Sequence, residues 1–128
     1  MMPSKNKPMI LLAEDEPNIV FSLSYVLERA GFEIEVCTDG AQVENKVRAT
    51  FPNLIILDLM LPNKSGFEIM SDLKSQKRTS NIPILVLSAR GQESDMTRAK
   101  ELGANQYLTK PFSNAEVIKI SKELLNIS

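Results

Sequence analysis

The stretch Leu54-Ile55-Ile56-Leu57-Asp58 places an aspartate directly after four consecutive apolar residues. Apolar runs without polar alternation are typical of strands that are buried on both faces of a parallel sheet. Two further runs have the same character, Met9 to Ala13 and Ile84 to Leu87. The three runs together predict a parallel sheet whose two faces are both covered.

The segments around these runs complete an alternating order of strands and helices. Phe32 to Val36 alternates apolar and acidic residues, which predicts a half-exposed strand at a sheet edge, and Tyr107-Leu108 mark a short fifth strand. Apolar positions at helical spacing lie within Ile19 to Ala30, Val43 to Val47, Phe67 to Leu73, Met96 to Leu102 and Val117 to Ile127. The sequence therefore predicts an α/β domain over residues 9–127, a doubly wound five-stranded parallel sheet flanked by five helices. Residues 1–8 are expected to be disordered or extended.

Composition narrows the possible functions. The 128 residues have a formal net charge of −1, so no basic surface predicts direct binding to nucleic acid. Cys37 is the only cysteine and histidine is absent, which favours a reducing cytoplasm and excludes Ser-His-Asp catalysis. No apolar run approaches the length that a membrane span requires. Carboxylates, hydroxyls and lysines must therefore supply the chemistry.

Polar residues follow four of the predicted strands. Glu14-Asp15-Glu16 follow the first, Asp58 the third, Ser88 the fourth and Thr109-Lys110 the fifth. Sites in open parallel sheets form where the strands end at their carboxyl edge, so these groups are expected to meet. Converging carboxylates repel one another unless cations compensate. Lys110 supplies one charge, and an all-oxygen site with few carboxylates suits Mg²⁺ better than zinc or copper.

With a metal ion in place, Asp58 is a plausible nucleophile toward phosphorus, because carboxylates serve that role in other phosphoryl-transfer proteins. Phosphoryl transfer mainly requires in-line positioning and neutralisation of the phosphoryl oxygens. Mg²⁺, Lys110 and the Ser88 hydroxyl would supply that shell. Without histidine the domain can accept a phosphoryl group but cannot present a phosphohistidine.

The motifs of this chain resemble the receiver domain of two-component response regulators, the CheY-like superfamily. They are Ile10 to Glu16, Leu57 to Pro62 with Gly66 following, Leu87 to Arg90, Gly103-Ala104, and Tyr107 to Phe112. They cover essentially the whole chain in order and with family spacing. The resemblance implies a flavodoxin-like sheet with strand order 2-1-3-4-5. The motifs are closest to the winged-helix transcription-factor branch.

The resemblance implies a phosphoacceptor and its metal ligands. Asp58 would be the phosphorylation site. Asp15 and Asp58 would bind Mg²⁺ directly together with the backbone carbonyl of Met60, and Glu14 would act through a water molecule. These roles are expectations carried over from the matching positions of the family.

Further roles follow from the same resemblance. Ser88 and Lys110 would contact the phosphoryl oxygens, and the Lys110-Pro111 peptide bond would be cis. Tyr107 would be an aromatic switch that follows Ser88. Met60 and Arg90, two residues past the acceptor and the switch hydroxyl, would tune the rate of dephosphorylation.

The expected partners are a histidine kinase or a histidine-containing phosphotransfer protein, and a downstream protein target or a fused output domain. The domain would be no enzyme beyond catalysing its own phosphorylation and dephosphorylation. Asn105-Gln106 and Ile120 stand where the transcription-factor branch carries charged residues that pair its receivers. A monomer or a weak dimer is therefore expected. Both a stand-alone receiver and a receiver cut from a longer regulator or hybrid kinase are compatible with these motifs.

Two other functions fit parts of the pattern. A phosphatase of the haloacid dehalogenase type also uses an aspartyl nucleophile and Mg²⁺, but it requires a second aspartate where Met60 stands. A flavodoxin-type cofactor module needs a phosphate-binding loop after the first strand. Glu14-Asp15-Glu16 would repel a phosphate there unless metal is bound. Both functions are therefore disfavoured.

Overall fold

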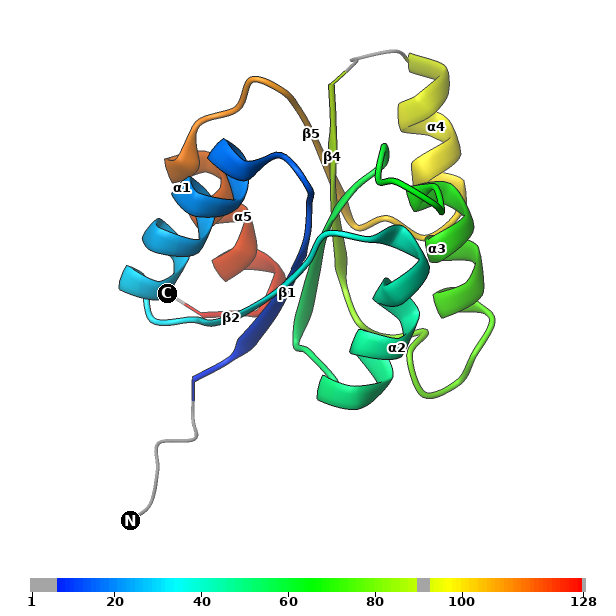
Figure 1. Cartoon of the computed structure of the whole chain (residues 1–128), viewed down its shortest axis with the longest axis horizontal. Helices are drawn as coiled ribbons and strands as arrows, with labels where there is room; N and C mark the ends of the chain where they lie inside the picture. The colour runs from blue at the N-terminus through cyan, green and yellow to red at the C-terminus, as the bar shows by residue number, and fades with distance from the viewer. Residues whose placement is uncertain (1–6, 90–92, 128) are drawn as a thin grey trace.

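The computed structural model describes residues 7–89 and 93–127, and most of the predicted N-terminal segment 1–8 lies outside them. Strands and helices alternate along the described chain (Figure 1). The elements are β1 (Met9–Ala13), α1 (Pro17–Arg29), β2 (Glu33–Cys37), α2 (Gly40–Thr50), β3 (Leu54–Asp58), α3 (Gly66–Lys74), β4 (Ile84–Ser88), α4 (Glu93–Glu101), β5 (Gln106–Thr109) and α5 (Asn114–Leu124).

The five strands form one parallel sheet in the order β2-β1-β3-β4-β5, which confirms the predicted doubly wound topology. The register pairs Ala13 with Leu57, Asp58 with Leu87, and Ser88 with Thr109. The carboxyl ends of β1, β3, β4 and β5 therefore lie at the same edge of the sheet. This is the edge at which the sequence predicts a site.

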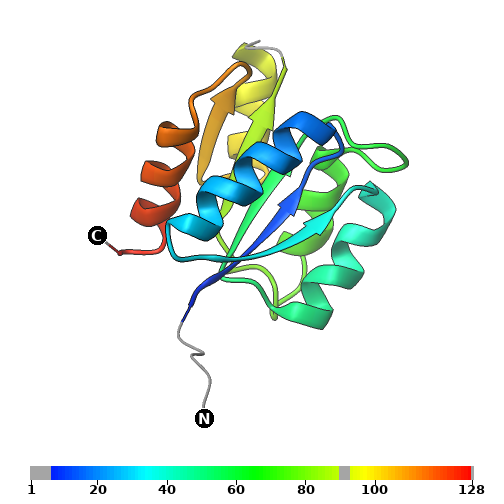
Figure 2. The same cartoon turned by 60° about the vertical axis from the view of Figure 1, so that its left-hand side comes forward.

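Helices cover both faces of the sheet, α1 and α5 on one face and α2, α3 and α4 on the other (Figures 1 and 2). Side chains of β3 alternate between them: Ile55 and Leu57 pack on the α2–α4 side, and Leu54 and Ile56 on the α1–α5 side. Because both faces are buried, the four residues of β3 that precede Asp58 are all apolar. This explains the continuous runs of the sequence.

Strand β2 begins at Glu33, one residue later than the predicted Phe32. The N–H of Phe32 donates to the carbonyl of Leu27, and Gly31, whose φ is 106°, donates to Glu28. These two bonds close the last turn of α1 in a Schellman motif, which a left-handed glycine permits. The backbone N–H of Phe32 is thus used to end α1, and the strand begins at the next residue.

Two helices begin at serine caps. Ser113 Oγ accepts from the N–H of Glu116 at 3.0 Å and so caps α5. The full reciprocal capping box lies at α3, where Ser65 and Glu68 exchange side-chain and backbone bonds. In residues 7–89 and 93–127, no helix is both long and apolar enough to cross a membrane.

Candidate functional site

Asp58 is the last residue of β3, the central strand, and only 3% of its surface is exposed. Within residues 7–89 and 93–127, its carboxylate accepts two hydrogen bonds. Met60 N donates to Oδ1 at 3.0 Å, and Lys110 Nζ donates to Oδ2 at 3.1 Å. The chain thus fixes the orientation of the carboxylate at the carboxyl edge of the sheet, where the sequence predicts it.

Lys110 follows β5 directly and joins three strand ends. Its backbone N–H donates to the carbonyl of Ser88 at 2.7 Å, and its peptide bond to Pro111 is cis, as expected. Its ammonium lies 3.3 Å from the carboxylate of Glu14 and 3.1 Å from that of Asp58. The ammonium therefore bridges the carboxylates delivered by β1 and β3.

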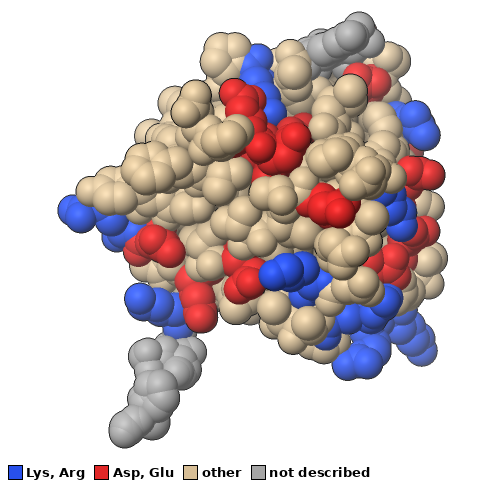
Figure 3. Space-filling model, in the orientation of Figure 1, with Lys and Arg blue, Asp and Glu red and all other residues tan. Residues whose placement is uncertain are grey.

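Glu14, Asp15 and Asp58 each place a carboxylate oxygen within 4.8 Å of the other two. Figure 3 shows acidic side chains gathered beside a basic one toward the upper edge of the molecule. Glu14 is fully buried, whereas Asp15 is exposed. Glu14 Oε1 accepts no hydrogen bond from any described residue. This buried oxygen has the Lys110 ammonium 3.3 Å away but accepts no well-aligned hydrogen bond, and together with the other carboxylate oxygens it fits a site for Mg²⁺.

The charges of the site change its proton affinities. The pKa of Glu14 is raised to about 7, first by burial and then by the negative charge of Asp58, against the lowering effects of the Glu16 N–H and Lys110. Burial alone would lower the pKa of Lys110. The hydrogen bond and charge of Asp58, together with Glu14, outweigh it and raise that pKa above its ordinary value. Without metal, the ammonium is thus held in its charged form.

Ser88 ends β4 next to Asp58 and is buried. Tyr107 lies on β5, half-buried, and packs against the core on the α2–α4 side. The predicted tuning residue Arg90 lies outside the described residues, whereas Met60 is 75% exposed beside the acceptor. The structure thus brings Glu14, Asp15, Asp58 and Lys110 together.

Sequence reasoning did not assign a role to Glu16. Its backbone N–H donates to Glu14 Oε2 at 3.1 Å, and its carboxylate lies 3.9 Å from Lys110 Nζ. It thereby holds the side chain of Glu14 in place. The feature of the sequence that could have indicated this role is the position of Glu16 in the acidic triplet that follows β1.

The fold and the site together define a class of protein. It is a doubly wound α/β domain that carries an acidic cluster and the Lys110 ammonium at the carboxyl edge of its sheet. Residues 10–122 match the response regulator receiver domain family, so the chain belongs to that family. Phosphorylation by histidine kinases is the general function of receiver domains. The phosphatase and flavodoxin alternatives are thereby set aside.

Two curated relatives are similar over almost the whole chain. The alkaline phosphatase synthesis transcriptional regulatory protein PhoP of Bacillus subtilis is 42% identical over 119 residues, 93% of this chain and 49% of that protein. The phosphate regulon transcriptional regulatory protein PhoB of Rhizobium meliloti is 39% identical over 118 residues, 92% of this chain and 52% of that protein. The chain spans about half the length of both relatives.

A solved structure adds a metal-bound comparison. The receiver domain of the sensor histidine kinase PA1611 of Pseudomonas aeruginosa has a magnesium ion coordinated in its active-site cleft. It superimposes with a TM-score of 0.86 at 27% identity, covering 94% of this chain and 98% of that one.

Proposed function

We propose that Asp58 is the phosphoacceptor of this receiver domain. The observation that carries the proposal is the position of the Asp58 carboxylate, held by Met60 N and Lys110 Nζ within an acidic cluster. In the transfer step, a carboxylate oxygen attacks the phosphorus of a phosphohistidine donor. The new P–O bond forms as the P–N bond to the imidazole breaks. The imidazole nitrogen leaves with that electron pair and takes up a proton from water.

Asp15, Asp58 and the Met60 carbonyl would hold Mg²⁺ directly, and Glu14 through water. When bound, the ion would neutralise charge on the phosphoryl oxygens. Lys110 binds one of those oxygens with its ammonium, which already lies 3.1 Å from Asp58 Oδ2. Buried Glu14 keeps Lys110 charged and oriented between the two carboxylates.

The Ser88 hydroxyl would contact the phosphoryl group and so report phosphorylation. A phosphoryl group adds nearly two negative charges at Asp58, which draws in nearby donors. Movement of Ser88 would give Tyr107 room to turn, and Tyr107 already packs against the core on the α2–α4 side. Output would then pass through the surface of α4, β5 and α5.

Labelling tests the phosphoacceptor. The protein is incubated with acetyl phosphate and Mg²⁺, its intact mass is measured, and the acyl phosphate is trapped with borohydride for peptide mapping. The wild type is expected to gain one phosphoryl group at Asp58, and Asp58→Asn none. Asp95→Asn, on α4, is the matched control and should label normally. A phosphoryl group mapped elsewhere in the wild type would contradict the assignment.

A comparatively long-lived phosphoryl group is also expected. The exposed Met60 side chain lies beside Asp58 and would obstruct the in-line water, and Arg90 stays protonated and cannot act as a base. Met60→Asn or Arg90→Glu should shorten the half-life of the label, measured by its decay after the donor is removed. Fast decay in the wild type that neither substitution alters would count against this expectation.

The proposed partners are a histidine kinase or a histidine-containing phosphotransfer protein, and a downstream protein or fused output domain. Residues 9–127 would form the receiver unit, working in the cytoplasm and acting catalytically only on its own phosphorylation and dephosphorylation. The uncharged Asn105 supports a monomer or weak dimer, because it cannot form an ion pair across an interface, and its Oδ1 accepts from Ile84 N of the same chain at 2.9 Å. Sedimentation of the beryllofluoride-activated form checks this, and a tight symmetric dimer would refute it.

A further inference from the structure

The loop between β3 and α3, residues 59–65, is called here the acceptor loop. Leu59 and Leu61 are buried, and Met60 between them is exposed. The base of the loop is closed where Gly66 N donates to Leu59 O at 3.0 Å. A Cβ on Gly66 would lie 2.8 Å from Leu59 Cα, so the helix that follows packs directly on the loop. The loop is therefore held at Leu59, where α3 begins.

The far end of the acceptor loop is held by the first residues of α2. Gly40 N donates to Pro62 O at 2.9 Å. Asn63 Nδ2 donates to Asp39 Oδ1 at 2.9 Å, and the same oxygen caps α2 by accepting from Ala41 N. Asp39 therefore fixes the start of the helix and the tip of the loop with one atom.

Gly40 is also the point of closest approach between α2 and the acceptor loop. A Cβ at this position would lie 2.2 Å from Lys64 O and 2.9 Å from Pro62 O, both backbone atoms. Among the glycines that the structure describes, Gly31 and Gly103 have positive φ, so Gly40 is required for space and not for an unusual backbone conformation. Any side chain at position 40 must displace residues 62–64.

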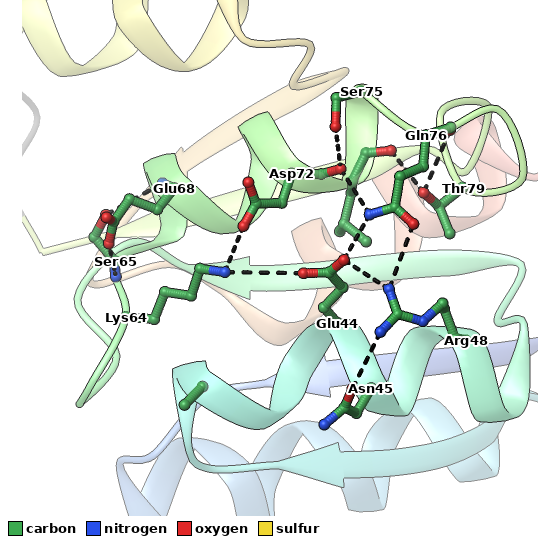
Figure 4. A network of polar contacts seen from close by, with 12 residues as sticks. Glu44, Asn45, Arg48, Lys64, Ser65, Glu68, Asp72, Ser75, Gln76 and Thr79 are labelled. Carbon is green, nitrogen blue, oxygen red and sulfur yellow. Dashed lines mark hydrogen bonds and ion pairs between the residues drawn. The ribbon is translucent and has the colours of Figure 1, made fainter.

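A charged bridge follows the same contact. Lys64 extends between α2 and α3, where its ammonium lies 2.5 Å from Asp72 Oδ2 and 3.8 Å from Glu44 Oε1 (Figure 4). Lys64 is therefore attached to both helices through its side chain, and its backbone carbonyl lies against Gly40. Residues 62–64 have no room to shift toward α2.

We propose that Asp39 and Gly40 are positioning residues for the metal site, because they fix residues 62–64 and through them the Met60 carbonyl. The inference rests on the proposed function, in which that carbonyl is a ligand of Mg²⁺. Mg²⁺ demands nearly ideal octahedral geometry at about 2.0–2.1 Å, whereas Ca²⁺ tolerates longer and irregular coordination. A displaced loop must therefore weaken Mg²⁺ binding more than Ca²⁺ binding.

The test is calorimetric titration of the whole chain with MgCl₂ and, separately, with CaCl₂, well below the unfolding temperature. Gly40→Ala is expected to weaken Mg²⁺ binding about tenfold, as loss of outer-shell support does in other metal sites. Ca²⁺ binding should fall less, so the ratio of the two affinities changes. Gly31→Ala is the matched control: its φ of 106° makes alanine strained, but no atom lies within 4 Å of the new Cβ. It should lose stability and keep the wild-type affinities.

Asp39→Ser provides a second variant in case Gly40→Ala does not fold. Serine still caps α2 but is too short to keep the bond to Asn63, so a smaller loss of Mg²⁺ affinity, about threefold, is expected. Its unfolding curve in urea shows whether the helix cap survives. The same change in the ratio of Mg²⁺ to Ca²⁺ affinity should appear.

The outcomes separate the two proposals. A wild type that binds no Mg²⁺ would overturn the metal site and this inference with it. A second outcome would overturn only the inference: the wild type binds Mg²⁺ and Asp15→Asn does not, but Gly40→Ala and Asp39→Ser bind Mg²⁺ as tightly as the wild type. Equal loss in Gly31→Ala would do the same, since general destabilisation would then explain the effect.

Discussion

On one side of Asp58, the acceptor loop is held against α2 by hydrogen bonds from Gly40 N to Pro62 O and from Asn63 Nδ2 to the Asp39 carboxylate. On the other side, Glu14 and Lys110 surround the Asp58 carboxylate with buried charges. The pKa of Glu14 is about 7, so this second side responds to pH in the physiological range. On the loop side, the pKa of Asp39 lies below its ordinary value, so its carboxylate stays ionised throughout that range. Geometry and charge are thus controlled by separate parts of the site.

Removal of the Lys110 ammonium should lower the free energy of unfolding more than any substitution on the side of the acceptor loop. Lys110→Met leaves Glu14 and Asp58 buried without their cation, and breaking such a pair costs about 3 kcal/mol or more. Urea unfolding at pH 8 without metal should show this loss, with a smaller loss at pH 5.5, where Glu14 is protonated. Lys119→Met, on the exposed face of α5, is the control. An equal loss at both pH values would show that the buried charges are not the cause.

The effect of Glu14→Gln on the free energy of unfolding should depend on whether Mg²⁺ is present. The folded pKa of Glu14, about 7, lies above the ordinary 4.5, so this carboxyl's stabilisation is complete below pH 4.5 and is lost as the pH rises to 7. Glutamine has no such loss, so the metal-free variant should be more stable than the wild type at pH 8, by up to about 3 kcal/mol. Saturating Mg²⁺ should narrow or invert that difference.

The measurement is urea unfolding with EDTA and with MgCl₂, at pH 4.5 and pH 8. Glu123→Gln, exposed on α5, is the matched substitution and should change little in any condition. A metal-free Glu14→Gln variant that is less stable than the wild type at pH 8 would contradict the prediction.

On the side of the acceptor loop, Asn63→Ala should lower stability by the same amount at every pH from 5 to 8. Asn63 has a φ of 72°, and alanine in the left-handed region costs about 1–2 kcal/mol. Its partner Asp39 has a pKa below the ordinary value, chiefly because of the Asn63 hydrogen bond, so it stays ionised from pH 5 to pH 8. Unfolding free energies at these two pH values should fall equally. Asn63→Gly permits the same φ and isolates the lost hydrogen bond.

The smallest effect is expected for the charged bridge on the outside of the acceptor loop. Lys64 and its partners are partly exposed, and such ion pairs contribute less than about 1 kcal/mol. Lys64→Met should therefore lower the unfolding free energy slightly at low salt and not measurably at high salt. A salt-independent loss would indicate that packing of the Lys64 chain matters more than its charge.

Much of this arrangement is visible in the sequence because it follows local patterns. Continuous apolar runs predict β1, β3 and β4, and a residue that ends such a run must lie at the site edge, which places Asp58 and Ser88. The sequence did not show which of Glu14 and Asp15 is buried. Glu14 N bonds to Cys37 O, so β1 pairing extends one residue further and turns Glu14 inward.

The contact between Gly40 and the acceptor loop could not be predicted from any such pattern. A glycine that is needed for space looks in the sequence like any helix-starting glycine. Its partner atoms are backbone oxygens of Pro62 and Lys64, which no side-chain type reveals. Only the packing of α2 on the loop identifies the position.

The exposure of the Met60 side chain has a consequence for mutational freedom. In the proposed site, position 60 supplies only its backbone carbonyl to the ion, and 75% of the residue's surface faces solvent. The position of this ligand therefore depends on the backbone conformation of the loop. It is kept with any side chain at position 60 that does not disturb the loop. Substitutions at this position can change how long the signal persists without disturbing the chemistry that writes it. The lifetime of the signal and the capacity to receive it can thus be selected independently.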